Sequence, residues 1–226
     1  MSNPLNSKVL LKIYSRLMKK YGPQYWWPGD SQFEIIIGAI LTQSAAWTNV
    51  EKAIINLKAA GALIPDRIEE LPLGQLADLI RPSGYYNAKA KKLKAFVSWL
   101  KDNYDYNLDS LFAVDTEKLR RMLLSVHGIG EETADSIILY AAEKPVFVID
   151  AYTRRTMSRI GLMPLEAGYS VYQQFFMHNL PVDIKMFNEY HALLVKLGKS
   201  VCRKSNPGCG ECCLESICKK QRPELA

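Results

Sequence analysis

The stretch from Leu123 to Arg155 constrains the fold most strongly, because two glycines separate two helical patterns within it. One apolar helix closes before Gly128, and a second with apolar residues at helical spacing begins after Gly130. Glycine adopts backbone angles that other residues avoid, so the chain can reverse tightly here and approach a ligand closely. The N–H groups that begin the second helix favour an anion such as phosphate. The alternative for a bare Gly-x-Gly is a helix–turn–helix whose glycines only permit packing.

An apolar run follows the second helix and ends at Asp150, directly before a further helical pattern. The stretch therefore predicts a turn that holds a phosphate backbone, followed by the end of the apolar run, where the Asp150 carboxylate is presented to a ligand. The rest of the chain has no strand pattern of any length, no repeat and no low-complexity tract, which predicts an all-α fold. Other helices are expected at Val9–Leu17, Phe33–Leu41, Asn49–Leu57, Phe96–Tyr104, Leu108–Phe112, Thr116–Leu124, Tyr152–Ile160, Tyr169–Asn179 and Phe187–Gly198, with short ones from Pro65 to Leu79.

Composition and charge favour a soluble protein that binds a polyanion. The chain has 226 residues, of which 48% are hydrophobic and 23% charged, and its net charge is +6. A sequence pI of about 9.0 points the same way, although many enzymes without nucleic-acid partners are also basic. No apolar run approaches membrane-spanning length and the N-terminus lacks the signal-peptide pattern, so we expect a cytoplasmic protein with no membrane partner.

All five cysteines lie between Val201 and Lys219, which argues against a disulfide framework that links distant segments. Thiolates gathered in one loop suit zinc or an iron–sulfur cluster. The spacing C-x6-C-x2-C-x5-C differs from the paired CxxC motifs of a zinc ribbon, which remains the generic alternative. Cys213 falls outside this spacing and is expected to be a free thiol. The candidate ligands are Cys202, Cys209, Cys212 and Cys218.

The residues from Val126 to Asp135, together with Val148-Ile149-Asp150, resemble the helix-hairpin-helix and catalytic Asp of the endonuclease III superfamily of DNA glycosylases. The resemblance covers nearly the whole chain. It implies one domain from residue 32 to 144 and a second made of residues 1–31 and 145–226, with the active-site cleft between them. The same cysteine spacing marks the cluster loop of endonuclease III relatives, so a [4Fe–4S] cluster is expected in residues 202–218.

The resemblance also implies which residues meet DNA. Gln43 matches a residue that approaches the lesion. The turn at Gly84 leads into an expected helix start that carries Asn87, Lys89, Lys91 and Lys92, and it resembles the second DNA-contacting turn of the family. Tyr85 or Tyr86 could wedge between bases, whereas a solvated face is the alternative for the lysines alone. His127 is a candidate phosphate contact, with a structural role as the alternative. The expected DNA-binding residues are Gln43, Tyr85, Tyr86, Asn87, Lys89, Lys91, His127, Gly128, Gly130 and Thr133.

Aromatic residues predict the walls of a pocket for an extruded base. Tyr25-Trp26-Trp27-Pro28 cannot continue a helix, so its rings point in different directions and could stack on a flat base. A hydrophobic staple on the next helix is the alternative for this loop, and a core position is the alternative for Trp47. The expected pocket residues are Trp26, Trp27, Pro28, Trp47 and Glu132.

The identity of residue 132 predicts how the reaction proceeds. In bifunctional members of the superfamily, the residue two after the second hairpin glycine is a lysine that attacks the sugar. Here it is Glu132, which cannot form an imine, so water is the expected nucleophile and an abasic site the expected product. Asp150 is the expected catalytic carboxylate, which stabilises positive charge on the sugar and activates the water.

The substrate expectation follows from the same resemblance. Trp-Trp-Pro, the Thr42-Gln43 turn and the hairpin residues look most like the 3-methyladenine branch, although the best-known member of that branch lacks the cysteine loop. Electron-rich rings would select a cationic alkylated purine through stacking and cation–π attraction. The alternatives are an endonuclease III-like glycosylase for oxidised pyrimidines and a non-catalytic protein that binds damaged DNA. The expected partner is double-stranded DNA with a damaged base, bound by a monomer in the cytoplasm at the nucleoid.

Overall fold

The computed structural model describes residues 4–219, so the ends of the predicted second domain, residues 1–3 and 220–226, lie outside the described part. Every regular element in residues 4–219 is a helix, which confirms the all-α prediction. None of the helices in this range is long and apolar enough to span a membrane.

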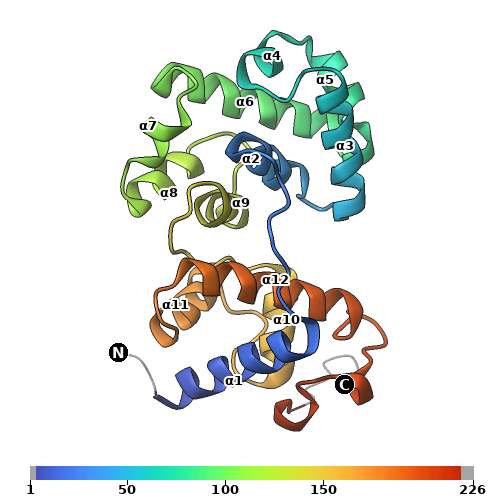
Figure 1. The fold of residues 1–226 in the computed structure, drawn as a ribbon, viewed down its shortest axis with the longest axis vertical. Helices are drawn as coiled ribbons and strands as arrows, with labels where there is room; N and C mark the ends of the chain where they lie inside the picture. The colour runs from blue at the N-terminus through green and yellow to red at the C-terminus, as the bar shows by residue number, and fades with distance from the viewer. Residues whose placement is uncertain (1–3, 220–226) are drawn as a thin grey trace. The chain divides into compact units, whose positions relative to one another are not determined.

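The chain forms two compact units (Figure 1). The continuous unit runs from Trp27 to Lys144, and the composite unit joins the segment up to Trp26 to the segment from Pro145 onward. The first crossing between them lies at Trp26–Trp27 rather than before Gln32, the boundary expected from the sequence. The two adjacent tryptophans therefore belong to different units.

The continuous unit is built around α2 (Gln32–Leu41), which is apolar almost all round and almost wholly buried. The Ser31 side chain accepts a hydrogen bond from the backbone N–H of Glu34 and caps this helix. The helix contacts α3 (Trp47–Ala59), α6 (Tyr86–Tyr104), α9 (Glu131–Ser136) and the π-helix η2 (Ile137–Ala141). The remaining elements of the unit are α4 (Pro65–Glu70), α5 (Leu73–Leu79), η1 (Arg81–Ser83), α7 (Leu108–Phe112) and α8 (Thr116–Leu124).

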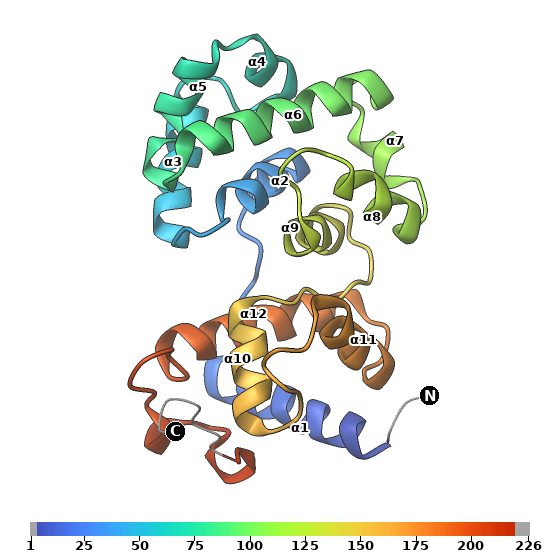
Figure 2. The same ribbon diagram turned by 180° about the vertical axis from the view of Figure 1, so that it is seen from behind.

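Helix α6 begins at Tyr86, where the sequence predicts a helix start after the Gly84 turn, and it continues without a break through the helix expected from Phe96 to Tyr104. Gly84 and Tyr85 adopt left-handed backbone angles, with φ of +67° and +47°, and the helix starts directly after them. Figure 2 shows the long helix that results, which contacts both α4 and α5. Its buried positions are Lys89, Ala90, Leu93, Phe96, Val97 and Leu100. The lysines near its start interrupt the apolar periodicity, so the sequence does not show that this helix start and the segment Phe96–Tyr104 form one helix.

The composite unit packs α12 (Ile184–Ser200) against α1 (Pro4–Tyr21) and α10 (Ala151–Ile160). Its aromatic core includes Phe147 and Phe176, whose rings stack with centroids 4.0 Å apart. Helix α11 (Tyr169–Asn179) contacts α1, and the cysteine loop carries the short helices η3 (Cys209–Glu211) and η4 (Glu215–Ile217).

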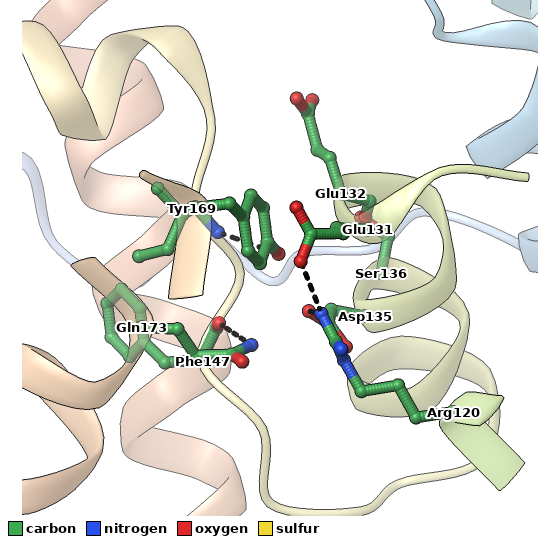
Figure 3. Close-up of polar contacts among 9 residues, drawn as sticks. Arg120, Glu131, Glu132, Asp135, Ser136, Phe147, Tyr169 and Gln173 are labelled. Carbon is green, nitrogen blue, oxygen red and sulfur yellow. Dashed lines mark hydrogen bonds and ion pairs between the residues drawn. The ribbon is translucent and has the colours of Figure 1, made fainter. Parts of the chain in front are cut away.

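The apolar run before Asp150 is a buried extended segment without a paired strand. Polar side chains of α11 therefore satisfy its backbone groups. Gln173 donates to the carbonyl of Phe147 at 2.9 Å, and the hydroxyl oxygen of Tyr169 accepts from the N–H of Ile149 at 3.3 Å (Figure 3). Anchored in this way, the segment delivers Asp150 to the start of α10.

Candidate active site and nucleic-acid interface

Gly128 gives the hairpin turn its shape. Its φ is +84°, in the left-handed region that favours glycine, and a Cβ there would lie 2.6 Å from Cδ of Lys92. Gly130 has an ordinary φ of −95° and caps the start of α9, with nothing within 4 Å of a Cβ built there. Only the first glycine is therefore required by the local structure.

Gln43 fastens the turn from inside. Its side-chain amide donates to the carbonyl of Gly128 at 3.0 Å and to the hydroxyl of Thr133 at 2.9 Å. The ammonium of Lys92 in turn donates to the amide oxygen of Gln43. Gln43 and Thr133 thus hold the turn in its shape, and the expected contact of either with DNA stays a prediction. Lys92 was expected with its neighbours at a phosphate site, but it lies three residues after Lys89 on the inner face of α6.

A bidentate ion pair joins the helices on either side of the turn (Figure 3). Arg120 of α8 donates to the two carboxylate oxygens of Asp135 of α9 at 2.8 and 3.1 Å, and the Asp135 side chain is 0% exposed. The same guanidinium lies 3.4 Å from Glu131. Glu132, on the same helix, is exposed and points away from this cluster. The sequence motif contains Asp135 but gives no indication of its partner.

The expectation that Lys89 binds DNA is wrong. Lys89 is only 2% exposed, and its ammonium donates at 2.7 Å to each of two carbonyls, those of Leu41 and Ser83. Burial, with a smaller effect from the charge of Lys92, lowers the pKa of Lys89 to about 8. The side chain therefore satisfies the C-terminus of α2 and the end of η1 and is not available to a phosphate.

The other expected DNA contacts of this unit are at the surface. Tyr85 is 76% exposed at the strained start of α6, and Asn87 and Lys91 lie beside it on exposed positions. Tyr86 is half-buried, with the Arg81 guanidinium 5.1 Å from its ring centroid. His127 is exposed directly before the turn. These placements leave Tyr85, Asn87, Lys91 and His127 as accessible candidates.

Trp27 and Trp47 come together in the continuous unit. Their ring centroids lie 5.3 Å apart with an interplanar angle of 89°, and Trp27 also lies 5.3 Å from the ring of Tyr140. Gly38 makes room for the Trp27 indole against α2, where a Cβ would lie 3.0 Å from its nitrogen. Trp27 therefore packs against the following helix, as the alternative of a hydrophobic staple requires. Trp47 lines a surface pocket of about 510 Å³, together with Pro28, Gly29, Asp30, Glu34, Glu51, Ile54, Ile55 and Lys58.

In the composite unit, Asp150 is a buried N-cap carboxylate. It is 8% exposed, and its Oδ1 accepts from the N–H of Thr153 at 2.7 Å. Its Oδ2 lies 3.6 Å from Nε2 of His191, a buried residue of α12. Burial acts to raise the pKa of Asp150, but His191 and the Thr153 N–H outweigh it, so the pKa lies below its usual value. The Asp150 carboxylate is therefore kept ionised although it is buried.

The sequence predicts that His191 is a satisfied, partly buried residue rather than a catalyst, and the structure places it buried in α12. Its apolar neighbours on α12 favour a structural histidine, and only tertiary structure brings it to Asp150.

Helix α12 also supports the loop that carries Trp26. The Glu189 carboxylate accepts from the backbone N–H groups of Gln24 at 2.8 Å and Tyr25 at 3.0 Å, which fixes the loop just before Trp26. The ammonium of Lys199 lies 5.6 Å from the Trp26 ring centroid. Helix α12 therefore carries partners for both Asp150 and the aromatic loop.

The four candidate ligand cysteines share one loop, and their side chains, like that of Cys213, are half-buried thiols outside any disulfide. Burial raises the pKa of Cys212 to about 11, and the charges of Cys213, Cys202 and Cys218 add to this effect. In residues 4–219 no three His, Cys, Asp or Glu side chains are gathered closely enough to hold a metal ion. The donor chemistry still fits a cluster, since the buried guanidinium of Arg159 lies 3.5 Å from the sulfur of Cys202.

Comparison with known proteins identifies a family. A model of the HhH-GPD superfamily of base excision DNA repair proteins matches residues 37–181. The chain is 43% identical over 213 residues to a Methanocaldococcus jannaschii protein that is named as a DNA repair glycosylase. The match covers 93% of this chain and 96% of that protein. It is 30% identical to endonuclease III of Sulfolobus acidocaldarius, covering 83% of this chain and 81% of the relative.

Solved structures agree in fold. The 3-methyladenine DNA glycosylase of H. pylori, solved with bound 1,N6-ethenoadenine, matches with a TM-score of 0.75 and 28% identity over 86% of this chain and 97% of that one. An endonuclease III–DNA complex matches with a TM-score of 0.82 over 95% of both chains, at 20% identity, and shows the similarity of fold alone.

The two hairpin glycines should respond differently to alanine. Gly128→Ala meets both a left-handed φ and the Lys92 stem, so we expect the free energy of unfolding to fall by about 1–3 kcal/mol. Gly130→Ala, the matched control, should change it by no more than about 0.5 kcal/mol. Urea denaturation of both variants measures this, and equal losses would contradict the assignment of the turn to Gly128.

The Asp150 carboxylate should make stability depend on pH in a defined direction. Its folded-state pKa lies below the unfolded value of about 3.9, so its ionised form stabilises the fold above that value. This contribution is lost as pH falls through the folded-state pKa. Asp150→Asn keeps a cap acceptor but removes the charge, so wild type should be more stable at neutral pH and the difference should shrink in acid. Urea unfolding at pH values from about 7 down to about 3 tests this, and a pH-independent difference would contradict it.

Proposed function

Because the chain belongs to the HhH-GPD superfamily of base excision DNA repair proteins, we propose that it is a hydrolytic DNA glycosylase that removes an alkylated purine from double-stranded DNA. The observation that carries this proposal is the buried, ionised carboxylate of Asp150 at the start of α10. When the bond between sugar and base breaks, positive charge develops on the sugar. A carboxylate close to C1′ stabilises that charge and orients or deprotonates the attacking water.

The hairpin supports water as the nucleophile. An imine with the sugar requires an amine, and residue 132 offers an exposed carboxylate instead. The product would then be an abasic site on an intact strand. The retained Asp150 argues against a protein that only binds damaged DNA, because binding alone has no use for a buried carboxylate held ionised.

DNA binding would use the Gly128 turn and the accessible residues of the continuous unit. Backbone N–H groups at a helix start and the ammonium of Lys91 suit phosphate oxygens, and the exposed ring of Tyr85 suits insertion between bases. Extruding a base costs a few kcal/mol, which such contacts offset. We propose that the protein acts as a monomer on one damaged duplex.

Two observations bear on the substrate. The half-buried ring of Trp26 and the similarity to a 3-methyladenine DNA glycosylase solved with 1,N6-ethenoadenine support an alkylated purine. The 30% identity to an endonuclease III supports the second candidate, an oxidised pyrimidine.

We also propose that Cys202, Cys209, Cys212 and Cys218 hold a [4Fe–4S] cluster. When bound, such a cluster would cross-link the cysteine loop through four iron–thiolate bonds. The guanidinium of Arg155 donates to the Cys202 carbonyl at 2.9 Å and, with Arg159, holds the first ligand against α10. These residues would place the loop, and base removal is assigned to the protein side chains described above.

A matched panel of damaged duplexes tests the activity and its substrate. Wild type should excise 3-methyladenine faster than thymine glycol, measured as abasic sites under single-turnover conditions. Asp150→Asn preserves the N-cap and should slow excision by about 10²-fold or more, with little change in DNA affinity. Unchanged excision in this variant would refute the role of Asp150, and preference for thymine glycol would favour the second candidate.

Residue 132 provides a separate test of the nucleophile. Borohydride reduction of wild type with damaged DNA should trap no covalent adduct. Glu132→Lys should restore an amine at the hairpin position and yield a trapped adduct, whereas Glu131→Lys, one residue away on the same helix, should not. A wild-type adduct would contradict the hydrolytic route.

A further inference from the structure

Lys199 lies among the residues of the composite unit that the proposed function uses. Its ammonium sits 5.6 Å from the Trp26 ring centroid, near the C-terminal end of α12. Helix α12 carries both Lys199 and His191, whose Nε2 lies 3.6 Å from Oδ2 of Asp150, and the charge of Asp150 acts to raise the pKa of Lys199. Glu189, on the same helix, fixes the loop that carries the ring.

The position of Lys199 changes what Trp26 can select. The cation–π attraction that would draw a cationic base to this ring is already made by the lysine. A base with a fixed positive charge that stacked here would meet the ammonium at short range. Like charges repel more strongly in a partly desolvated site than in water, so such a base is disfavoured.

The charge also affects how a base leaves. When the C1′–N bond breaks, its electron pair goes to the base and the sugar becomes positive. A neutral base acquires negative charge in this step, which a nearby ammonium stabilises. A cationic base becomes neutral and gains nothing from it. Water then adds to C1′ and releases one proton. The anion formed from a neutral base takes up one proton, which completes the hydrolysis.

We propose that Lys199 is a specificity-determining residue that shifts this site toward neutral alkylated purines, such as 1,N6-ethenoadenine, and away from cationic ones, such as 7-methylguanine. The inference rests on the proposed glycosylase function and narrows its substrate class. Burial lowers the pKa of Lys199 while the charge of Asp150 opposes this change, which makes the ammonium a better proton donor to a departing base than an ordinary lysine.

The test compares single-turnover excision of 1,N6-ethenoadenine and 7-methylguanine from otherwise identical duplexes. Lys199→Gln should slow ethenoadenine excision and preserve or speed that of 7-methylguanine, so their ratio should shift by about tenfold. That is less than the roughly 10²–10³ of a fully enclosed donor, because the side chain of Lys199 lies at the surface and is only partly desolvated. Lys199→Arg keeps the charge and should retain most of the wild-type ratio. Lys185→Gln, which removes an exposed lysine at the other end of α12, is the matched control and should change neither rate.

The possible results separate this inference from the proposed function. If Lys199→Gln slows both bases by the same factor, Lys199 serves DNA binding or folding and the inference fails alone. An unchanged ratio in an active variant also overturns it. If wild type excises neither base, the proposed function fails for alkylated purines and the inference fails with it. Thermal melting of each variant checks that the fold is kept.

Discussion

The ionised carboxylate of Asp150 is the constraint on which the composite unit depends. A buried charge is costly unless it is paired and hydrogen-bonded, so the surrounding structure must supply partners. The Thr153 N–H at the start of α10 supplies one, and His191 of α12 supplies the other. The extended segment before Asp150 must be buried and satisfied in turn, which explains the bonds from Tyr169 and Gln173. One helix, α12, also holds the aromatic loop through Glu189 and Lys199.

The continuous unit solves a different problem, which is to hold a tight turn rigid while leaving its outer surface free for a ligand. Gln43 and Lys92 bind the inner side of the turn, and the Arg120–Asp135 pair fixes the helices around it. Because of helix periodicity, some of the lysines on α6 face the interior of the unit and others lie at its surface. Lys89 and Lys92, three residues apart, face inward, whereas Lys91 lies at the surface. A basic run in a sequence therefore does not identify which members meet a phosphate.

Much of the fold could be predicted from local pattern. The expected helices Leu108–Phe112, Thr116–Leu124 and Tyr169–Asn179 occur with those same bounds, because their caps and apolar spacing are local signals. The start of α6 after the Gly84 turn was predicted, whereas its continuity with the segment Phe96–Tyr104 was not, because the lysines near its start interrupt the apolar spacing. The burial of Lys89 was missed because a lysine is rarely buried, and its compensation comes from carbonyls of α2 and η1.

The sequence by itself determined the all-α class, the hairpin with its glycine turn, the clustering of the cysteines in one loop and the presence of a carboxylate at the end of an apolar run. These features are local, so spacing and residue type suffice to indicate them. Tertiary structure alone decided that His191 pairs with Asp150, that Gln43 holds the turn, and that Lys199 covers the ring of Trp26. These pairs join residues distant in sequence, and the partner of a polar group follows from packing between helices, which no local periodicity encodes.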